Sequence, residues 1–424
     1  MKHAWVVGAI ALMLAGCGGA GGSAGEEVSD SAAADAHTDG TGAADASSQD
    51  GRTGETDGCA GQAAPFSEMF DAVLANLLAT GECVAGNWEE DFGDACFYGQ
   101  ALLVWQGEET QDAKLAKLGL ESAGYAWECA ETFNANPASF LSGSDDLLLG
   151  LFGLFETYRR YDAVVAVAGA DGWRPDGQKE GLAAILGETV QSFDELLSGL
   201  GDYVPDFDVY ALYTYGNTVV TALFGLLYVE YARTFPEEAG PWVARAEELV
   251  EVIRDAAFDP DLGGFRVRPD DPELEIYPNI TMMLLLGRLY LLTGDETHLE
   301  TALQLYDAIQ PLKDVEQGSY RSPYSAETMG AKTDDYKTLS SQLYTILAFF
   351  TMYECTQDPR WLEEVAAIFG FIDSHLRQGG KLLHHWMDGE VAKPEHLEYY
   401  CVGCNFQALY ALKYYWTKPY CSKQ

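Results

Sequence analysis

The segment from Ile280 to Leu292 is apolar on nearly all sides of any helix drawn through it, and Arg288 is its one charged residue. A helix on a protein surface shows an apolar stripe instead, and a membrane-spanning helix needs about 20 apolar residues. This run is shorter, and Asn279 and Thr281 make its start polar. The sequence therefore predicts a helix that is packed on all sides in a protein interior.

The helix that follows has only one apolar face. In the segment 296–309, Leu299, Ala302, Tyr306 and Ile309 fall on one side at helical spacing, while glutamate and glutamine residues occupy the other side. This pattern predicts a half-exposed helix. A short Gly-Asp turn joins it to the buried one. The two segments together predict a hairpin of one inner and one outer helix.

The same hairpin recurs along the chain. Tyr228, Tyr290, Met352 and Tyr414 occupy corresponding places in four buried segments, each 62 residues after the one before. A fixed period of this length indicates a repeat architecture. Earlier segments fit more loosely, and in all we expect about twelve helices in about six hairpins. The buried segments are 97–105, 142–161, 215–235, 277–293, 335–358 and 401–416, and the amphipathic ones are 112–133, 179–200, 239–258, 296–309 and 359–378.

Helices that are buried all round fit the inner layer of a two-layer helical ring. We therefore expect an all-α fold, an (α/α)6 toroid, although an open helical solenoid would show the same repeat. The hairpin 289–309 and the turns Gly263–Gly264 and Gly379–Gly380 resemble the six-hairpin glycosidase-like (α/α)6-barrel superfamily. The resemblance covers most of 60–420. It implies the fold, and one fold hosts many reactions.

The N-terminus has the pattern of an export signal. Lys2 and His3 precede the apolar run Ala4–Leu14, and the sequence Leu-Ala-Gly-Cys ending at Cys17 is similar to a bacterial lipobox. We expect residues 1–16 to be a lipoprotein signal peptide and Cys17 to carry lipid, with an ordinary signal peptide and a chance cysteine as the alternative. By resemblance to lipoprotein sorting, Gly18 after the cysteine implies anchoring to the outer membrane.

The next segment has almost no large apolar side chains. Residues 17–58 are rich in Gly, Ser, Ala and Asp, so they read as the lipidated cysteine and a flexible acidic linker. The folded domain is then 59–424, about 365 residues, which is enough for a large core. With 25 Lys and Arg against 66 Asp and Glu, the chain carries a net charge of −41. Nucleic acid is thereby excluded as a partner.

Eight cysteines follow Cys17. An even number in an exported chain suggests disulfides, whose pairing the sequence does not give. Cys401 and Cys404 also fit a metal-type C-x-x-C, but there is only one such pair. The segment around it faintly resembles the zinc element of lanthionine synthetase cyclases, whose second Cys-His element is missing here. We expect no metal and no cofactor.

Each inner helix begins with polar or aromatic residues, and in a ring these starts converge at one mouth. Aromatic rings there would stack on sugars, and amides and carboxylates would bind hydroxyl groups. Plain helix capping or packing is the alternative, because Asp and Asn are also preferred N-caps. The candidate substrate-binding residues at these starts are Tyr215, Asn217, Tyr277, Asn279, Tyr336 and Asn405.

Two Asp-Asp pairs also stand at inner-helix starts. Glycoside hydrolysis usually takes two carboxyl groups, and neighbouring carboxylates raise each other's pKa. Asp145 and Asp146 are similar to the Asp-Asp motif of the family 76 endo-mannanases, which implies a nucleophile and an acid/base in unassigned order. Asp334 and Asp335 form the second candidate pair. Helix capping is again the alternative for both pairs.

The segment "KLLHHWMDGE" adds His384, His385 and Trp386 as candidates, with His385 and Trp386 in substrate binding. A neutral histidine serves as an acid or base, and epimerases of the same fold use histidine, so the resemblance implies that role for His384 or His385. The leading hypothesis is a lipid-anchored glycoside hydrolase with a carbohydrate substrate. A non-catalytic glycan- or protein-binding lipoprotein, or a sugar epimerase or lyase, is the alternative.

Overall fold

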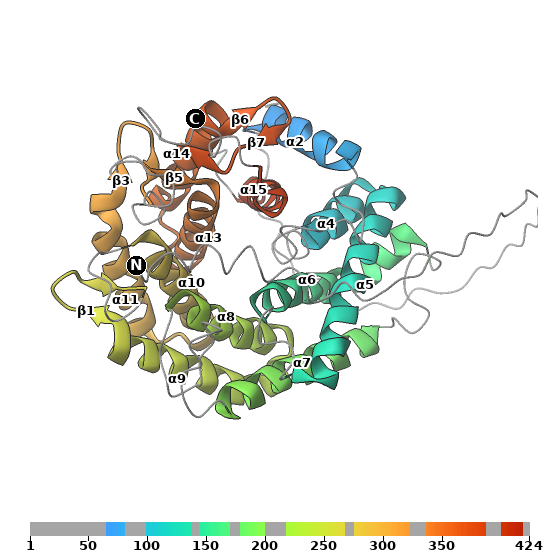
Figure 1. Cartoon of the computed structure of the whole chain (residues 1–424), viewed down its shortest axis with the longest axis horizontal. Helices are drawn as coiled ribbons and strands as arrows, with labels where there is room; N and C mark the ends of the chain where they lie inside the picture. Colours follow the sequence, from blue (N-terminus) through green and yellow to red (C-terminus); the bar gives the residue numbers. More distant parts are fainter. Residues whose placement is uncertain are drawn as a thin grey trace, which may run out of the picture.

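The computed structural model describes residues 65–80, 99–137, 144–169, 179–199, 218–267, 275–322, 336–386 and 400–418, and the side chains of α6 from residue 150 onward. Twelve α-helices of these residues form two concentric layers (Figure 1). The inner helices are α4 (Gln100–Thr110), α6 (Ser144–Ala168), α8 (Thr218–Thr234), α10 (Ile276–Thr293), α13 (Leu339–Thr356) and α15 (Val402–Trp416). The outer helices are α2 (Ser67–Thr80), α5 (Ala113–Ala135), α7 (Lys179–Gly199), α9 (Ala239–Ala257), α11 (Glu296–Ile309) and α14 (Arg360–Phe371).

The ring is closed rather than an open solenoid. Each inner helix contacts the next, and α15 contacts both α4 and α2. At this junction the indole N–H of Trp416 donates to the carbonyl of Pro65 (2.9 Å), and the ring of Trp416 packs on Phe70 at 4.9 Å between centroids. The first described helix of the chain is therefore the outer partner of the last one, a pairing that the sequence did not predict.

Burial follows the predicted division between layers. Helix α10 buries residues on every side, including Met282, Met283, Leu285 and Leu286 at 0% exposure. Helix α11 buries one face only. Among the described helices, α10 alone is long and apolar enough to cross a membrane, and 67% of it is buried inside the protein. The interior helix predicted from its all-round apolar composition is confirmed.

Close helix packing explains a glycine in this run. A Cβ atom on Gly287 would lie 2.6 Å from Cγ2 of Thr351 on α13, a distance that real Cβ contacts do not reach. The absence of a side chain at Gly287 lets α10 and α13 approach each other. Gly294 ends α10 in the left-handed conformation (φ 72°), which glycine adopts without strain.

Short antiparallel β-hairpins follow the outer helices where the sequence predicted glycine turns. Three of them repeat the same geometry, and a fourth two-stranded sheet joins distant segments. The hairpins are β1 (Phe258–Asp259) with β2 (Gly264–Phe265), β3 (Lys313–Asp314) with β4 (Ser319–Tyr320), and β6 (Arg377–Gln378) with β7 (Lys381–Leu382); the fourth sheet pairs β5 (Lys337–Thr338) with β8 (His385–Trp386). Short helical segments are the 3₁₀-helices Pro236–Glu238 and Gln310–Leu312 and the π-helix Ile372–Leu376.

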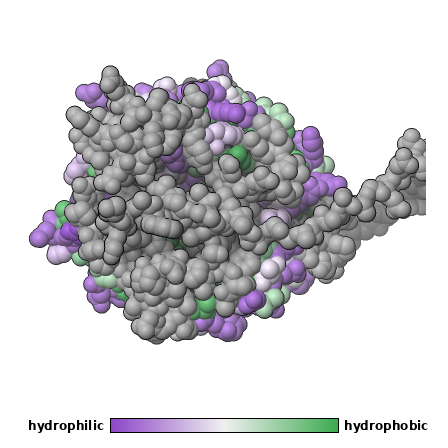
Figure 2. Space-filling view, viewed as in Figure 1, coloured by the Kyte–Doolittle hydropathy of each residue, from purple (hydrophilic) through white to green (hydrophobic). Residues whose placement is uncertain are grey.

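The visible rim of the molecule is mostly hydrophilic in the view down the ring, with scattered apolar residues (Figure 2). Large apolar side chains that are exposed among the described residues are Leu262, Leu291 and Val315. This surface agrees with the net charge of −41.

Candidate functional sites at the two ends of the ring

Buried amides fix the β-hairpins to the inner helices. The side-chain oxygen of Asn279 accepts the N–H of Phe265 (2.8 Å), and its nitrogen donates to the carbonyls of Phe265 (2.9 Å) and Glu275 (2.8 Å). Asn405 makes the same set with Leu382 and Cys401, at 2.8–2.9 Å. Asn279 and Asn405 are both 0% exposed. Both amides bond backbone N–H and carbonyl groups. This favours the packing alternative over sugar binding.

A third amide completes the series. Gln342 accepts the N–H of Tyr320 (2.9 Å) and donates to its carbonyl (2.7 Å). Asn279, Gln342 and Asn405 stand 63 residues apart. We call these three residues the amide clamps. Each clamp bonds both polar groups of one strand residue, and so holds the hairpin against the start of the next inner helix.

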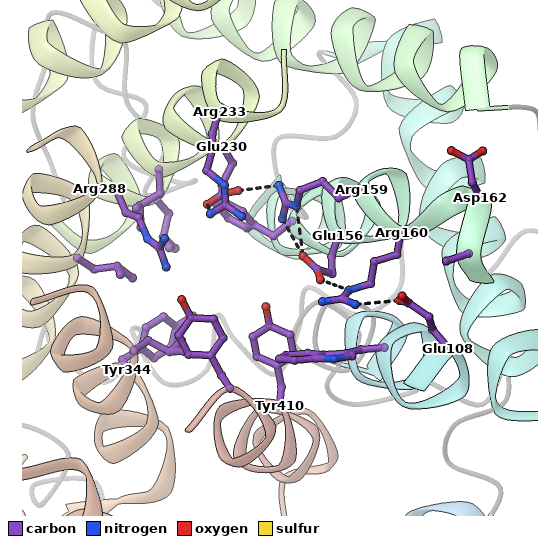
Figure 3. A pocket seen from close by; sticks show the side chains of 18 residues that line it. Glu108, Glu156, Arg159, Arg160, Asp162, Glu230, Arg233, Arg288, Tyr344 and Tyr410 are labelled. Carbon is purple, nitrogen blue, oxygen red and sulfur yellow. Dashed lines mark hydrogen bonds and ion pairs between the residues drawn. The ribbon is translucent and has the colours of Figure 1, made fainter. Parts of the chain in front are cut away.

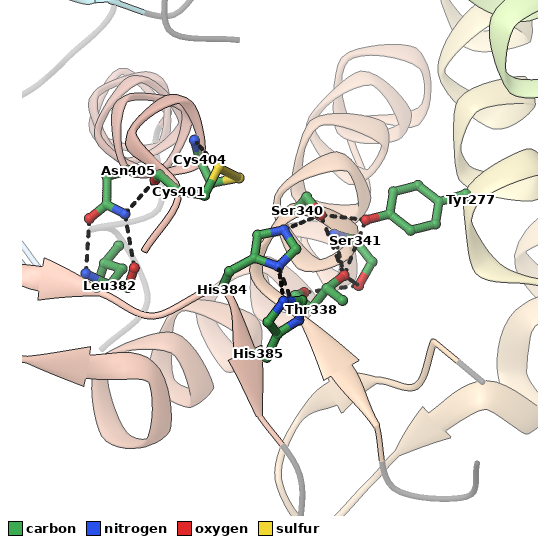
Figure 4. The surroundings of a disulfide bond; sticks show 10 residues. All are labelled: Tyr277, Thr338, Ser340, Ser341, Leu382, His384, His385, Cys401, Cys404 and Asn405. Carbon is green, nitrogen blue, oxygen red and sulfur yellow. Dashed lines mark hydrogen bonds between the residues drawn. A yellow bond between two sulfur atoms is a disulfide. The ribbon is translucent and has the colours of Figure 1, made fainter. Parts of the chain in front are cut away.

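A chain of polar side chains lies at the starts of α10 and α13 (Figure 4). The hydroxyl of Tyr277 bonds the hydroxyls of Thr338 (3.1 Å) and Ser340, and Ser340 Oγ lies 3.1 Å from Nε2 of His384. His384 Nδ1 lies 3.1 Å from His385 Nδ1. The candidates Tyr277 and His385 are therefore brought together at one end of the ring.

Tyr336 joins the same chain, since its hydroxyl lies 2.5 Å from Nδ1 of His385. Trp386 faces a different group. Its ring lies 4.5 Å from the ammonium group of Lys337, which is 0% exposed and pairs with Asp314 at 2.6 Å. In the described structure Trp386 thus contributes to holding a buried cation, while Tyr336 and His385 share a hydrogen bond.

His384 is an uncharged base at this end of the ring. Burial, and secondarily the neighbouring His385, lower the pKa of His384 to about 3. One of its ring nitrogens and the sulfurs of Cys401 and Cys404 lie within 4.8 Å of one another. These two cysteines form a disulfide (Figure 4), so they present no pair of thiolates to a metal in this state. This disulfide agrees with the expectation that cysteines of the chain pair, and Cys355 is a free thiol within the described structure.

A cavity of about 590 Å³ occupies the interior of the ring, and all six inner helices line it. Its residues come from the middle and the C-terminal halves of the helices, which places the cavity toward the end opposite to the histidine chain. We call it the lumen pocket. Figure 3 shows arginine and glutamate side chains on one side of it and Tyr344 and Tyr410 on the other. The lining residues are Trp105, Glu108, Phe152, Glu156, Arg159, Arg160, Asp162, Ala163, Leu223, Leu226, Glu230, Arg233, Leu284, Arg288, Tyr344, Leu347, Tyr410 and Tyr414.

An ion-pair network covers the charged side of the lumen pocket. Arg159 bonds Glu156 (3.0 Å) and Glu230 (3.0 Å), and so ties α6 to α8. Arg160 bonds the other oxygen of Glu156 (2.5 Å) and reaches Glu108 on α4 (2.8 Å). These pairs are the dashed contacts of Figure 3. They hold three adjacent inner helices at the level of the pocket.

Glu156 and Glu230, two carboxylates at the lumen pocket, stay ionised. Burial alone would raise the pKa of Glu156, but Arg159 and Arg160 hold it below its usual range. Burial likewise acts on Glu230, and Arg233, Arg159 and Arg288 together lower its pKa. A carboxylate held ionised by arginines is a poor proton donor. Glu156 and Glu230 are therefore suited to positioning and binding rather than to general acid catalysis.

The remaining predicted residues lie outside what the structure describes. Tyr215, Asn217, Asp334, Asp335 and Cys17 are not in the described ranges. Asp145 and Asp146 belong to the first turn of α6, but their side chains are not described. For Asp145 and Asp146 the prediction that they stand at an inner-helix start agrees with the helix bounds, and their catalytic role stays a prediction.

The lumen pocket was not predicted from the sequence. The predicted sites were the helix starts, whereas Glu156, Arg159, Glu230 and Arg288 lie farther along inner helices. The available signal was a charged residue inside an otherwise apolar inner helix. Arg288 is such a residue in α10, and Glu230 is one in α8. A charge that is buried in a helix interior is costly unless it is paired, so these positions could have been picked out together.

No protein-family model matches this chain, and no curated protein matches its sequence. Solved structures do match its fold. A glycosyl hydrolase family 88 protein from Bacteroides vulgatus is 10% identical at a TM-score of 0.54, with 83% of this chain and 98% of that chain covered. An unsaturated glucuronyl hydrolase from Bacillus sp. GL1 is 11% identical at 0.54, with 81% and 94% covered.

A cellobiose 2-epimerase from Bacillus thermoamylovorans is 11% identical at a TM-score of 0.51, with 77% of this chain and 87% of that chain covered. Two of these proteins are hydrolases and one is an epimerase, and at such identities the likeness concerns the fold. The closed ring of six hairpins described above and these matches lead to one conclusion: the chain has the (α/α)6-barrel fold that these three structures share.

Proposed function

We propose that this protein is a carbohydrate-active enzyme, a glycoside hydrolase that admits a glycan into the ring from the end where the inner helices start. The observation that carries the proposal is the lumen pocket, which combines aromatic rings with ionised groups in one cavity of about 590 Å³. Aromatic faces stack on sugar rings and charged groups bind hydroxyls. The structural neighbours include two hydrolases that act on carbohydrates.

Glu156 and Glu230 of the lumen pocket are not suited to be the proton donor of the reaction. The pKa of Glu156 and that of Glu230 are both lowered by arginines, so neither carboxyl group is protonated near neutral pH. The Asp145 and Asp146 pair supplies what is missing, because adjacent carboxylates raise each other's pKa. Asp146 and Glu156 belong to the same helix α6, about 15 Å apart along its axis. A glycan lying along α6 would reach both.

The experiment incubates the purified protein with a panel of polysaccharides and measures new reducing ends. The variant Asp145→Asn/Asp146→Asn is compared with Asp334→Asn/Asp335→Asn and with Glu300→Gln, a control on the exposed face of α11. We expect release by the wild type and the control, and loss of release in the Asp145/Asp146 variant. Release that survives this variant but is lost in the Asp334/Asp335 variant moves the site. Binding of a glycan without release from any member of the panel supports a binding protein instead.

The histidine chain favours a sugar epimerase as the second candidate. His384 is neutral and bonded through Ser340 to Tyr277, and one structural neighbour is an epimerase. An epimerase removes a proton next to the carbonyl carbon of the sugar and returns it on the other face. A base with a pKa of about 3 is weak for that step, which places this function second. Deuterium entering C2 of a disaccharide in D2O is the distinguishing result.

The proposal includes anchoring of the enzyme to the outer membrane by lipid at Cys17. It rests on the lipobox pattern before Cys17. Labelling of expressing cells with a fatty-acid analogue should mark the wild type and not Cys17→Ser. Equal labelling of both proteins would refute this part and leave the enzymatic proposal unaffected.

A further inference from the structure

We propose that the lumen pocket is a binding site for a small carboxylate that carries a ring, and that Arg288 binds its carboxylate group. This site lies toward the C-terminal ends of the inner helices. It is the same cavity in which the proposed hydrolase would hold its glycan, so the inference names a ligand class for that cavity, and it is measured by binding without glycan cleavage.

The charged side chains around the lumen pocket do not balance one another. The ion pairs around the lumen pocket join five cations, Arg159, Arg160, Arg233, Arg288 and Lys418, to four carboxylates, Glu108, Glu156, Glu230 and Glu354. Asp162, the other acidic residue at the pocket, pairs with Lys179 at 2.5 Å. Among the described side chains one positive charge is left over, in a chain whose net charge is −41. A cation that lines a cavity without a carboxylate of its own favours a ligand of the opposite sign.

The excess lies on the side of Arg288. Glu354 accepts from Lys418 (2.8 Å) and from the hydroxyl of Tyr414 on one oxygen, and its other oxygen lies 3.3 Å from Nη1 of Arg288. Two cations thus share one carboxylate. Glu156 and Glu230, by contrast, each use both oxygens on arginines.

Arg288 also retains donors that face the cavity. A guanidinium has five N–H donors, and within the described structure that of Arg288 makes one hydrogen bond, the long one to Glu354. Its side chain is 19% exposed and lines the pocket. A carboxylate accepts two parallel N–H bonds from such a fork, which an alcohol or a neutral sugar does not reproduce. Arg288 is therefore suited to select an acid over its neutral analogue.

The rest of the pocket suits a ring. Tyr344 and Tyr410 face the arginine side across the cavity (Figure 3), and Tyr414 and Trp105 also line the pocket. The leucines of α8 and α10 in the pocket wall add apolar surface. A cavity of about 590 Å³ with aromatic walls and a few convergent polar groups matches the sites that take compact ring-bearing ligands.

The test is calorimetric titration of the full chain with D-glucuronate, D-glucose and benzoate. Glucuronate and glucose share one ring and differ in a carboxylate against a hydroxymethyl group. We expect glucuronate to bind at least about tenfold more tightly than glucose, because charge-assisted hydrogen bonds to a buried arginine are stronger than neutral ones. Benzoate binding would show that an aromatic acid is also accepted. Equal affinity for glucuronate and glucose, or no binding of either acid, overturns the proposal.

Variants assign the binding to Arg288. Arg288→Met should lose about tenfold or more in affinity for glucuronate, and Arg288→Lys, which keeps the charge without the planar fork, should lie between. Arg254→Met is the matched control, because Arg254 pairs with Glu251 at 2.6 Å on the outer helix α9. Glucuronate binding that Arg288→Met leaves unchanged places the ligand elsewhere and refutes the assignment.

The outcome is separable from that of the proposed function. Acid binding is measured without turnover, and the comparison of glucuronate with glucose on the wild type requires no variant to fold. A chain that releases reducing ends but does not distinguish glucuronate from glucose keeps the hydrolase and loses this site. A chain that binds glucuronate through Arg288 and cleaves no glycan keeps this site and loses the hydrolase.

Discussion

Replacing Asn279 by leucine tests whether the amide clamps are structural. Leucine has a similar size but no hydrogen-bonding atoms, so the N–H and the carbonyl of Phe265 would both lose the partner that now lies 2.8–2.9 Å away. Asn279 is 0% exposed, and water does not replace it without a rearrangement. Each unsatisfied buried backbone group costs about 1–3 kcal/mol.

The expected loss is therefore about 4 kcal/mol of unfolding free energy for the two groups of Phe265. An unfolding entropy of about 2 cal/mol/K per residue converts this into a fall in Tm of about 5 °C for a body of this size. Differential scanning calorimetry measures it. Gln191→Leu is the control, because Gln191 bonds Glu195 on the exposed face of α7, and its Tm should change by about 1 °C or less.

The alternative for Asn279 was a sugar ligand. A ligand role predicts a loss of glycan binding in Asn279→Leu with little change in Tm. A structural role predicts a clear fall in Tm. A Tm within about 1 °C of the wild type would refute the clamp reasoning. Asn405→Leu should repeat the result, since Asn405 bonds the N–H and the carbonyl of Leu382 and the carbonyl of Cys401 in the same way.

Two further predictions concern packing and pH. Gly287→Ala should destabilise the protein by about 1–3 kcal/mol, since its Cβ would lie 2.6 Å from Thr351. Gly240→Ala is the control, because a Cβ there would have nothing within 4 Å. Measured by the same calorimetry, Gly240→Ala should be neutral or slightly stabilising. The folded-state pKa of His384 is about 3, below the unfolded value of about 6.5. Its neutral form therefore stabilises the fold above about pH 6.5, and that contribution is lost as pH falls toward 3, by about 1.4 kcal/mol per pH unit. His384→Asn should flatten the decrease in Tm between about pH 6.5 and 5; an unchanged slope would contradict the assignment of a neutral, buried His384.

The fold could be predicted because its causes are local. A helix such as α10 that is packed on all sides is apolar on all sides, so its own composition reveals its place. The period of 62 residues then identifies the other inner helices in the same way. The ring closure could not be read in the same way. Helix α2 pairs with α15 across the whole length of the chain, and no period along a sequence shows that its two ends meet.

The site was harder to predict for a similar reason. The lumen pocket takes residues from six helices, and the pairs that define it join Arg159 to Glu230 and Arg288 to Glu354 across 71 and 66 positions. The repeat aligns helices along the chain, but it does not show which side of each helix faces the centre. Asn279 and Asn405 show the opposite error. Each is a polar residue at a helix start, which suggested a ligand site, but its amide binds the backbone of a β-hairpin.

The junction of α15 with α2 has a consequence for the order of the hairpins. Because Trp416 bonds Pro65, the two ends of the described ring are neighbours, and the ring has no hairpin that must come first. A circular permutant that links these ends by a short flexible segment and opens the chain in the exposed turn at Gly294–Asp295 would keep every inner–outer pair. The ring architecture therefore does not require the chain to be open between α15 and α2.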